Sequence, residues 1–63
     1  MKLISVAEAD LMVFTNLEEL RILHAALNEI CNGIEIFEFE TRIGATLEEV
    51  NRVMRSLEEI LDS

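Results

Sequence analysis

Thr46-Leu47-Glu48-Glu49-Val50 and Asn16-Leu17-Glu18-Glu19-Leu20 stand thirty positions apart in this chain and read almost alike. Each stretch begins with a residue that can cap a helix, followed by two glutamates in the first turn, where the helix dipole favours negative charge. In the later stretch Glu49 follows Thr46 at the three-residue spacing of a capping box. Each stretch therefore predicts the start of a helix.

The apolar residues that follow each start recur at helical spacing, so both helices are expected to be amphipathic. The stripe of the first helix comprises Leu17, Leu20, Leu23, Leu27, Ile30 and Cys31. The stripe of the final helix comprises Leu47, Val50, Val53, Met54, Leu57, Ile60 and Leu61. All other positions from 48 to 59 are polar or charged, which predicts one buried face for the final helix. Gly33 is expected to end the first helix in the left-handed conformation that glycine adopts at little cost.

Residues 2–6 and 11–15 are short and rich in β-branched or bulky side chains, with a polar stretch between them. This composition predicts one or two strands, which could pair as a hairpin. A helix from Ser5 is the competing interpretation, because Ser5 and Glu8 have capping-box spacing.

Residues 34–43 allow two interpretations, since periodicity alone does not decide so short a run. A strand would place Phe37, Phe39, Thr41 and Ile43 on one face. A helix would bury Ile36, Phe39 and Ile43, with Gly44 as its cap. We favour the short helix, because another helix begins only a few residues later. The expected fold class is α+β, mainly α, within a single small domain spanning 1–63.

A domain of 63 residues is marginal on its own and usually depends on a disulfide, a metal, dense packing or oligomerisation. Cys31 is the only cysteine and His24 the only histidine, so an internal disulfide and a thiolate cluster are both excluded. Dense packing and oligomerisation therefore remain as the sources of stability for this domain.

Thirteen acidic against five basic residues give a formal net charge of −8. That charge disfavours nucleic-acid phosphates and anionic membranes, and it suits a basic protein partner. No apolar run approaches the ~20 residues needed to cross a bilayer, and no secretory signal is visible. We expect a cytoplasmic location and no membrane contact.

The two helices differ at three aligned positions, where the first is apolar or small and the final one is polar. Ile22, Ala25 and Ala26 on the first helix correspond to Arg52, Arg55 and Ser56 on the final one. A helix that is apolar beyond one face is buried on more than one side. We therefore expect a symmetric homodimer with the first helix near its axis.

The candidate interface residues are Ile22, Ala25 and Ala26 for the second copy, and Glu35, Glu38 and Glu40 for a basic partner. The acidic residues alternate with apolar ones, so solvated carboxylates are the simpler interpretation. Asn28, Glu29 and Arg42 are candidates for a structural clamp, in which Arg42 would reach back to a carboxylate such as Glu29.

No set of residues predicts an enzyme, a cofactor or a metal site. Seven helical residues separate His24 from Cys31 by roughly 10 Å, too far for a nucleophile and its base. The segment from Phe37 to Ser56 has the outline of a helix-turn-helix, which makes a DNA-binding regulator the alternative function. The second helix of that motif would present Glu48 and Glu49 to DNA, so nucleic acid is not the favoured partner.

The sequence from Phe14 to Gly44 contains Leu27-Asn28-Glu29, then Asn32-Gly33, then Phe39-Glu40-Thr41-Arg42-Ile43-Gly44. In this order it resembles small bacterial proteins with a strand, a helix, a turn and a short helix, some of which are immunity-like partners of toxins. The resemblance implies a short helix near 36–43 and no catalytic residues. Together with the composition, it predicts a homodimeric protein-binding module of immunity or antitoxin type.

Overall fold

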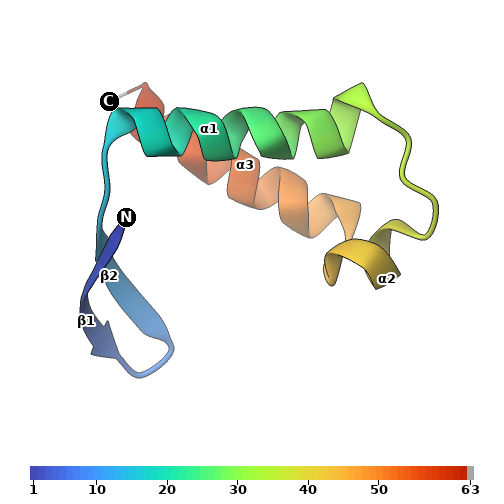
Figure 1. Ribbon diagram of the computed structural model, residues 1–63. Coiled ribbons are helices and arrows are strands. Elements are labelled where there is room, and N and C mark those ends of the chain that lie inside the picture. Colours follow the sequence, from blue (N-terminus) through green and yellow to red (C-terminus); the bar gives the residue numbers. More distant parts are fainter. Residues whose placement is uncertain (63) are drawn as a thin grey trace.

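The computed structural model describes residues 1–62, and it contains an N-terminal hairpin followed by helices. The elements are β1 (Lys2–Ala7), β2 (Asp10–Phe14), α1 (Leu17–Asn28), η1 (Glu29–Gly33), α2 (Phe39–Ile43) and α3 (Leu47–Leu61). Figure 1 shows α1 and α3 running antiparallel, the hairpin leaving the start of α1, and α2 at the opposite end. The expected fold class, mainly α with short N-terminal strands, is confirmed.

The hairpin pairs antiparallel from Lys2 opposite Phe14 to Ala7 opposite Asp10, with a β-bulge between Leu3 and Ser5. Its tight turn contains Glu8, whose φ of 56° lies in the left-handed region. The alternative of a helix from Ser5 is therefore wrong. Ser5 pairs with Met12, so the strand hydrogen bonds outweigh the local capping-box spacing.

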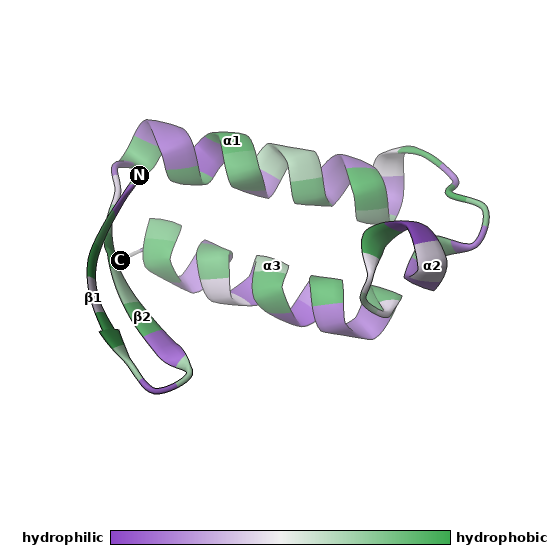
Figure 2. Cartoon of the chain, turned by 60° about the horizontal axis from the view of Figure 1, so that its bottom comes forward, coloured by the Kyte–Doolittle hydropathy of each residue, from purple (hydrophilic) through white to green (hydrophobic). Residues whose placement is uncertain are grey.

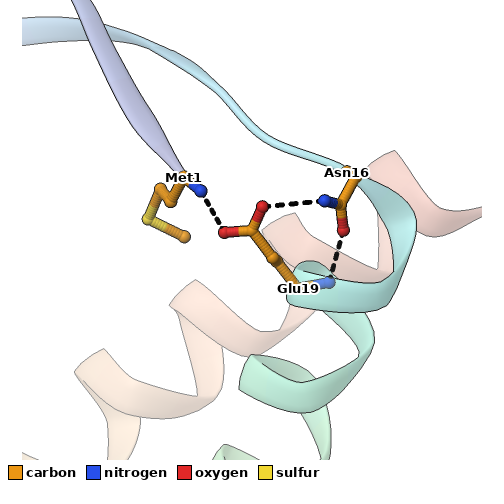
Figure 3. Close-up of polar contacts among 3 residues, drawn as sticks. All are labelled: Met1, Asn16 and Glu19. Carbon is orange, nitrogen blue, oxygen red and sulfur yellow. Dashed lines mark hydrogen bonds and ion pairs between the residues drawn. The ribbon is translucent and has the colours of Figure 1, made fainter.

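Asn16 caps α1, as its place at the start of the first stretch predicts. Its Oδ1 accepts from the backbone N–H of Glu19 at 2.8 Å, and its Nδ2 donates to Glu19 Oε1 at 2.9 Å. The other carboxylate oxygen of Glu19 pairs with the amino group of Met1, so one side chain links the start of β1 to the first turn of α1 (Figure 3).

Thr46 caps α3 in the expected capping box. Glu49 N–H donates to Thr46 Oγ1 and Thr46 N–H donates to Glu49 Oε1, both at 3.0 Å. The likeness of the two opening sequences thus corresponds to two caps in which the third helical residue, a glutamate, bonds back to the cap.

The end of the first helix differs from expectation. Instead of a left-handed Gly33, the last turn widens into the π-helical η1, which the Ile34 N–H closes by donating to Glu29 O at 3.0 Å. Among residues 1–62, the glycine with positive φ is Gly44, at 83°. Gly44 ends α2 in the left-handed conformation, as expected.

The helical interpretation of the middle segment is confirmed, because α2 forms from Phe39. It begins three residues later than Ile36, since Glu38 has a φ of 54° and interrupts any helix that would run through it. Ile36 and Phe39 are half-buried, whereas Ile43 is exposed.

The core lies between α1 and α3, which carry the main contacts between helices. Leu20 on α1 and Val50 and Met54 on α3 are its buried members. Figure 2 shows the two helices side by side with hydrophobic stretches along both. These helices therefore form a single layer, whereas a domain normally packs at least two.

Candidate interaction surface

α3 carries an exposed apolar flank beside its buried strip. Val50 and Met54 are buried, yet Val53 and Ile60 on the same helix are each 54% exposed. The expectation that all the apolar residues of this helix lie on one buried face is therefore wrong. The apolar stripe is wider than the surface of α1 that could cover it.

The exposed flanks of α1 and α3 lie on the same side of the helix layer. At 3.6 residues per turn, Leu23 and Ala26 lie to one side of the buried strip of α1. The half-buried Ile30 follows them in η1. Because the helices run antiparallel, this flank comes next to Val53 and Ile60 on α3. We call these five residues the open face.

The opposite side of the layer is polar where the two helices meet. His24 Nε2 on α1 lies 3.4 Å from Glu58 Oε1 on α3, close enough for an ion pair but without the geometry of a hydrogen bond. Helical spacing places both residues on the other side of the buried strips from the open face. The layer therefore carries a polar pair on one side and the open face on the other.

The hairpin is exposed on both faces, since every residue from Met1 to Phe14 is exposed. The pairing puts four apolar side chains on one face, and we call this set the hairpin face: Leu3, Val6, Leu11 and Val13. Met12 and Phe14 lie on the other face. Figure 2 shows hydrophobic colouring along both strands and hydrophilic colouring near the turn.

The chain exposes more surface than a compact monomer of its mass. For 7.2 kDa, the area expected is about 4,100 Å². The accessible area is 5316 Å², an excess of about 1,200 Å² over that expectation. The radius of gyration is 13.1 Å, against about 11 Å expected for 63 residues. The excess comes with exposed apolar side chains on the hairpin and the open face.

The candidate dimer residues on α1 are all exposed. Ala26 belongs to the open face, whereas helical spacing points Ile22 and Ala25 away from α3. Neither the hairpin face nor Leu23, Ile30, Val53 and Ile60 figured among the residues expected at the interface. The sequence nevertheless contains a sign of these residues. Apolar side chains occur at alternating positions that fall on both faces of the strands, and the apolar stripe of α3 is broad.

The three acidic candidates, Glu35, Glu38 and Glu40, are exposed in the segment from the loop after η1 to the start of α2. This segment lies at the opposite end of the molecule from the hairpin (Figure 1). The acidic segment and the apolar hairpin thus lie at opposite ends of the molecule.

A small open cavity of about 240 Å³ lies between η1, the following loop and the start of α3. Its lining is mainly apolar and includes Ile30, Cys31, Ile36, Phe39 and Leu47. Glu35 contributes the charged group. Cys31 is a free, half-buried thiol in this wall, while His24 faces Glu58. The structure thus does not bring the cysteine and the histidine together.

The clamp expected from Asn28, Glu29 and Arg42 does not form within residues 1–62. Asn28 Oδ1 accepts from Asn32 Nδ2 at 3.0 Å, one turn further along the same helical segment. The Glu29 carboxylate lies against the α-carbon side of Gly33, and no ion pair joins it to Arg42. The loop at residues 34–38 separates α2 from η1, so Arg42 remains exposed on α2.

Glu49, at the start of α3, has a perturbed pKa. The hydrogen bonds from the backbone and the side chain of Thr46 hold the pKa of Glu49 below its usual range. Glu49 therefore stays ionised beside Glu48 at the helix start. Over residues 1–62, no three acidic, histidine or cysteine side chains are placed to hold a metal ion.

No helix in this part of the chain is long and apolar enough to span a bilayer. Comparisons with known protein families, characterised proteins and solved structures find no match to this chain.

Proposed function

We propose that this protein is a non-enzymatic protein-binding module that works as a homodimer. The observation that carries the proposal is the excess of about 1,200 Å² of accessible surface over a compact monomer. A standard interface buries about 800 Å² on each partner, so one such contact would bring the chain close to the usual exposure for its mass. Large exposed apolar side chains gather on the hairpin face and on the open face, and exposed apolar patches of this kind typically mark interaction sites.

A basic protein is the second partner that the composition supports. The net charge is −8, and the acidic segment of Glu35, Glu38 and Glu40 is exposed and distant from the hairpin. None of these three carboxylates belongs to the hairpin face or to the open face, although Glu35 lines the same cavity as Ile30 of the open face. Complementary charge favours fast, specific association with a basic partner, as an immunity or antitoxin role requires.

The alternative is a DNA-binding regulator, because α2, its turn and α3 have the outline of a helix-turn-helix. The start of α3 would have to enter the major groove, and there it presents Glu48 and an ionised Glu49. A gel shift at low salt tests this alternative. Retardation of duplex DNA would favour the regulator, and its absence would favour the protein-binding module.

Light scattering on a chromatographed sample tests the homodimer with matched variants. Leu11→Glu puts a charge on the hairpin face, at a residue that is 63% exposed in the single chain. It should change the folding stability of one chain by no more than about 0.5 kcal/mol, since surface substitutions rarely do more. In a dimer that buries this face, it should shift the mass to that of the monomer. Phe37→Glu is the control, because Phe37 is 77% exposed in the loop at the other end of the molecule.

A further inference from the structure

The β1–β2 hairpin lacks the cover that such an element needs. A two-stranded hairpin is at best marginally stable alone in water, and it normally packs against a third strand or a helix. Here its residues are exposed on both faces, and the main helix contacts are made between α1, η1 and α3. We therefore expect another element to pack against the hairpin, on a face that carries apolar side chains.

The open face of the α1–α3 layer is also apolar and uncovered, and it is about as long as the hairpin face. Leu23 to Ile30 and Val53 to Ile60 each span seven residues, or about 10 Å along a helix. Leu3 to Val6 on the hairpin face span about 10 Å along a strand. The residues that make up the two faces are all apolar. The nearest charged groups on the flank of the open face, Glu19 and Glu49, are hydrogen-bonded within the helix caps.

The hairpin of the same chain is not positioned to cover this face. Only Thr15 and Asn16 join β2 to α1, and Asn16 is fixed in an extended conformation by its two hydrogen bonds with Glu19. The pairing of the Met1 amino group with Glu19 holds the other strand at the same place (Figure 3). Folding the hairpin back over its own helices would break this cap.

We propose that the hairpin is an arm that lies, by its hairpin face, across the open face of a second copy. A two-fold axis makes the exchange reciprocal, so each copy supplies one arm and receives one. The excess accessible area of about 1,200 Å² is enough for an interface of standard size on each copy. This inference rests on the proposed homodimer and specifies how that homodimer is built.

Disulfide trapping between two differently tagged chains tests the exchange. Both chains carry Cys31→Ser, which removes the only native thiol. One chain then carries Val6→Cys on the hairpin face, and the other carries Val53→Cys or, in a second experiment, Ile60→Cys on the open face. After mixing, subunit exchange and mild oxidation, we expect a disulfide-linked pair of unlike chains for at least one of the two helix positions. The matched control is Phe37→Cys in place of the helix cysteine, which should give at least tenfold less of the linked pair.

Sedimentation of the same mixtures separates failure of the arm exchange from failure of the homodimer. A dimeric mass with no enrichment of the unlike pair over the control would overturn the arm exchange and leave the homodimer standing. A dimer in which Val6→Cys links only to itself would do the same, because the hairpins would then meet each other. A monomeric mass at all concentrations would overturn both proposals.

Discussion

His24 on α1 and Glu58 on α3 face each other across the helix layer, with Nε2 and Oε1 3.4 Å apart. This polar pair lies on one side of the layer, and the open face lies on the opposite side. The side chains are 30% and 48% exposed, so water screens the pair. The stability of the layer must therefore come mainly from Leu20, Val50 and Met54, the buried residues between the helices.

Met54→Ala should destabilise the protein far more than Glu58→Gln. Removing a buried methionine side chain costs about 2–5 kcal/mol, whereas an exposed ion pair contributes at most about 1 kcal/mol. Thermal unfolding followed by circular dichroism measures both changes. Equal losses for the two variants would contradict the assignment of the core.

The two helix caps should contribute similarly to stability. Thr46→Ala and Asn16→Ala each remove a side chain that accepts a backbone N–H, at a cost of about 1 kcal/mol. For a domain of this size, that corresponds to a fall of roughly 4–8 °C in Tm. Thr46→Ser and Asn16→Ser keep a side-chain oxygen that can accept the backbone N–H, and they should restore most of the loss. If the alanine variants melted like wild type, the caps would have no energetic role.

Acid should weaken the start of α3 through Glu49. Its pKa is lowered in the folded protein by the hydrogen bonds from the Thr46 backbone and side chain. A carboxyl with a lower pKa when folded contributes stability above its unfolded pKa, near 4.5, and this contribution is lost as the pH falls through the folded pKa.

Urea unfolding at pH 7 and at about pH 3 measures this loss. Glu49→Gln should reduce the difference in stability between the two pH values, because its side chain does not titrate. Glu48→Gln makes the same charge change outside the capping box and serves as the control. An equal reduction in both variants would assign the acid sensitivity to general charge instead of the cap.

Added salt should strengthen the homodimer and weaken binding to a basic partner. Each copy has a formal charge of −8, so two copies repel until ions screen them, at a Debye length of about 10 Å in 0.1 M salt. An apolar interface gains from this screening, while an acidic surface facing a basic protein loses attraction. Dimer dissociation constants from sedimentation at 0.05 and 0.5 M salt provide the test, and a dimer that weakens with salt would contradict an apolar interface.

The elements that could be predicted from the sequence are those determined locally. Thr46 with Glu49, Asn16 and Gly44 each act within one helical turn, and each has the role expected of it. Gly33 differs, because the π-helical turn satisfies the backbone without a left-handed residue. The strands at 2–7 and 10–14 were visible in the composition of the segment, although a local capping pattern at Ser5 competed with them.

The candidate surface was harder to predict, because it depends on which apolar residues find a partner within the chain. Val53 and Ile60 have the same spacing as buried residues of α3, and only the position of α1 leaves them exposed. The hairpin has apolar side chains on both faces, and the pairing of the strands is needed to show that Lys2 and Asp10 lie on the face opposite Leu3 and Val6. Ile22, Ala25 and Ala26, expected at a dimer interface, are exposed in the single chain. Leu23 and Ile30 lie closer to α3 by helical spacing, and their place beside it depends on the packing of the two helices.

Sedimentation equilibrium of the wild-type chain over a range of micromolar concentrations tests whether the protein is a homodimer. One chain has a mass of 7.2 kDa, so a homodimer should give a fitted mass of twice 7.2 kDa that falls only on dilution. A fitted mass of 7.2 kDa at every concentration would contradict it.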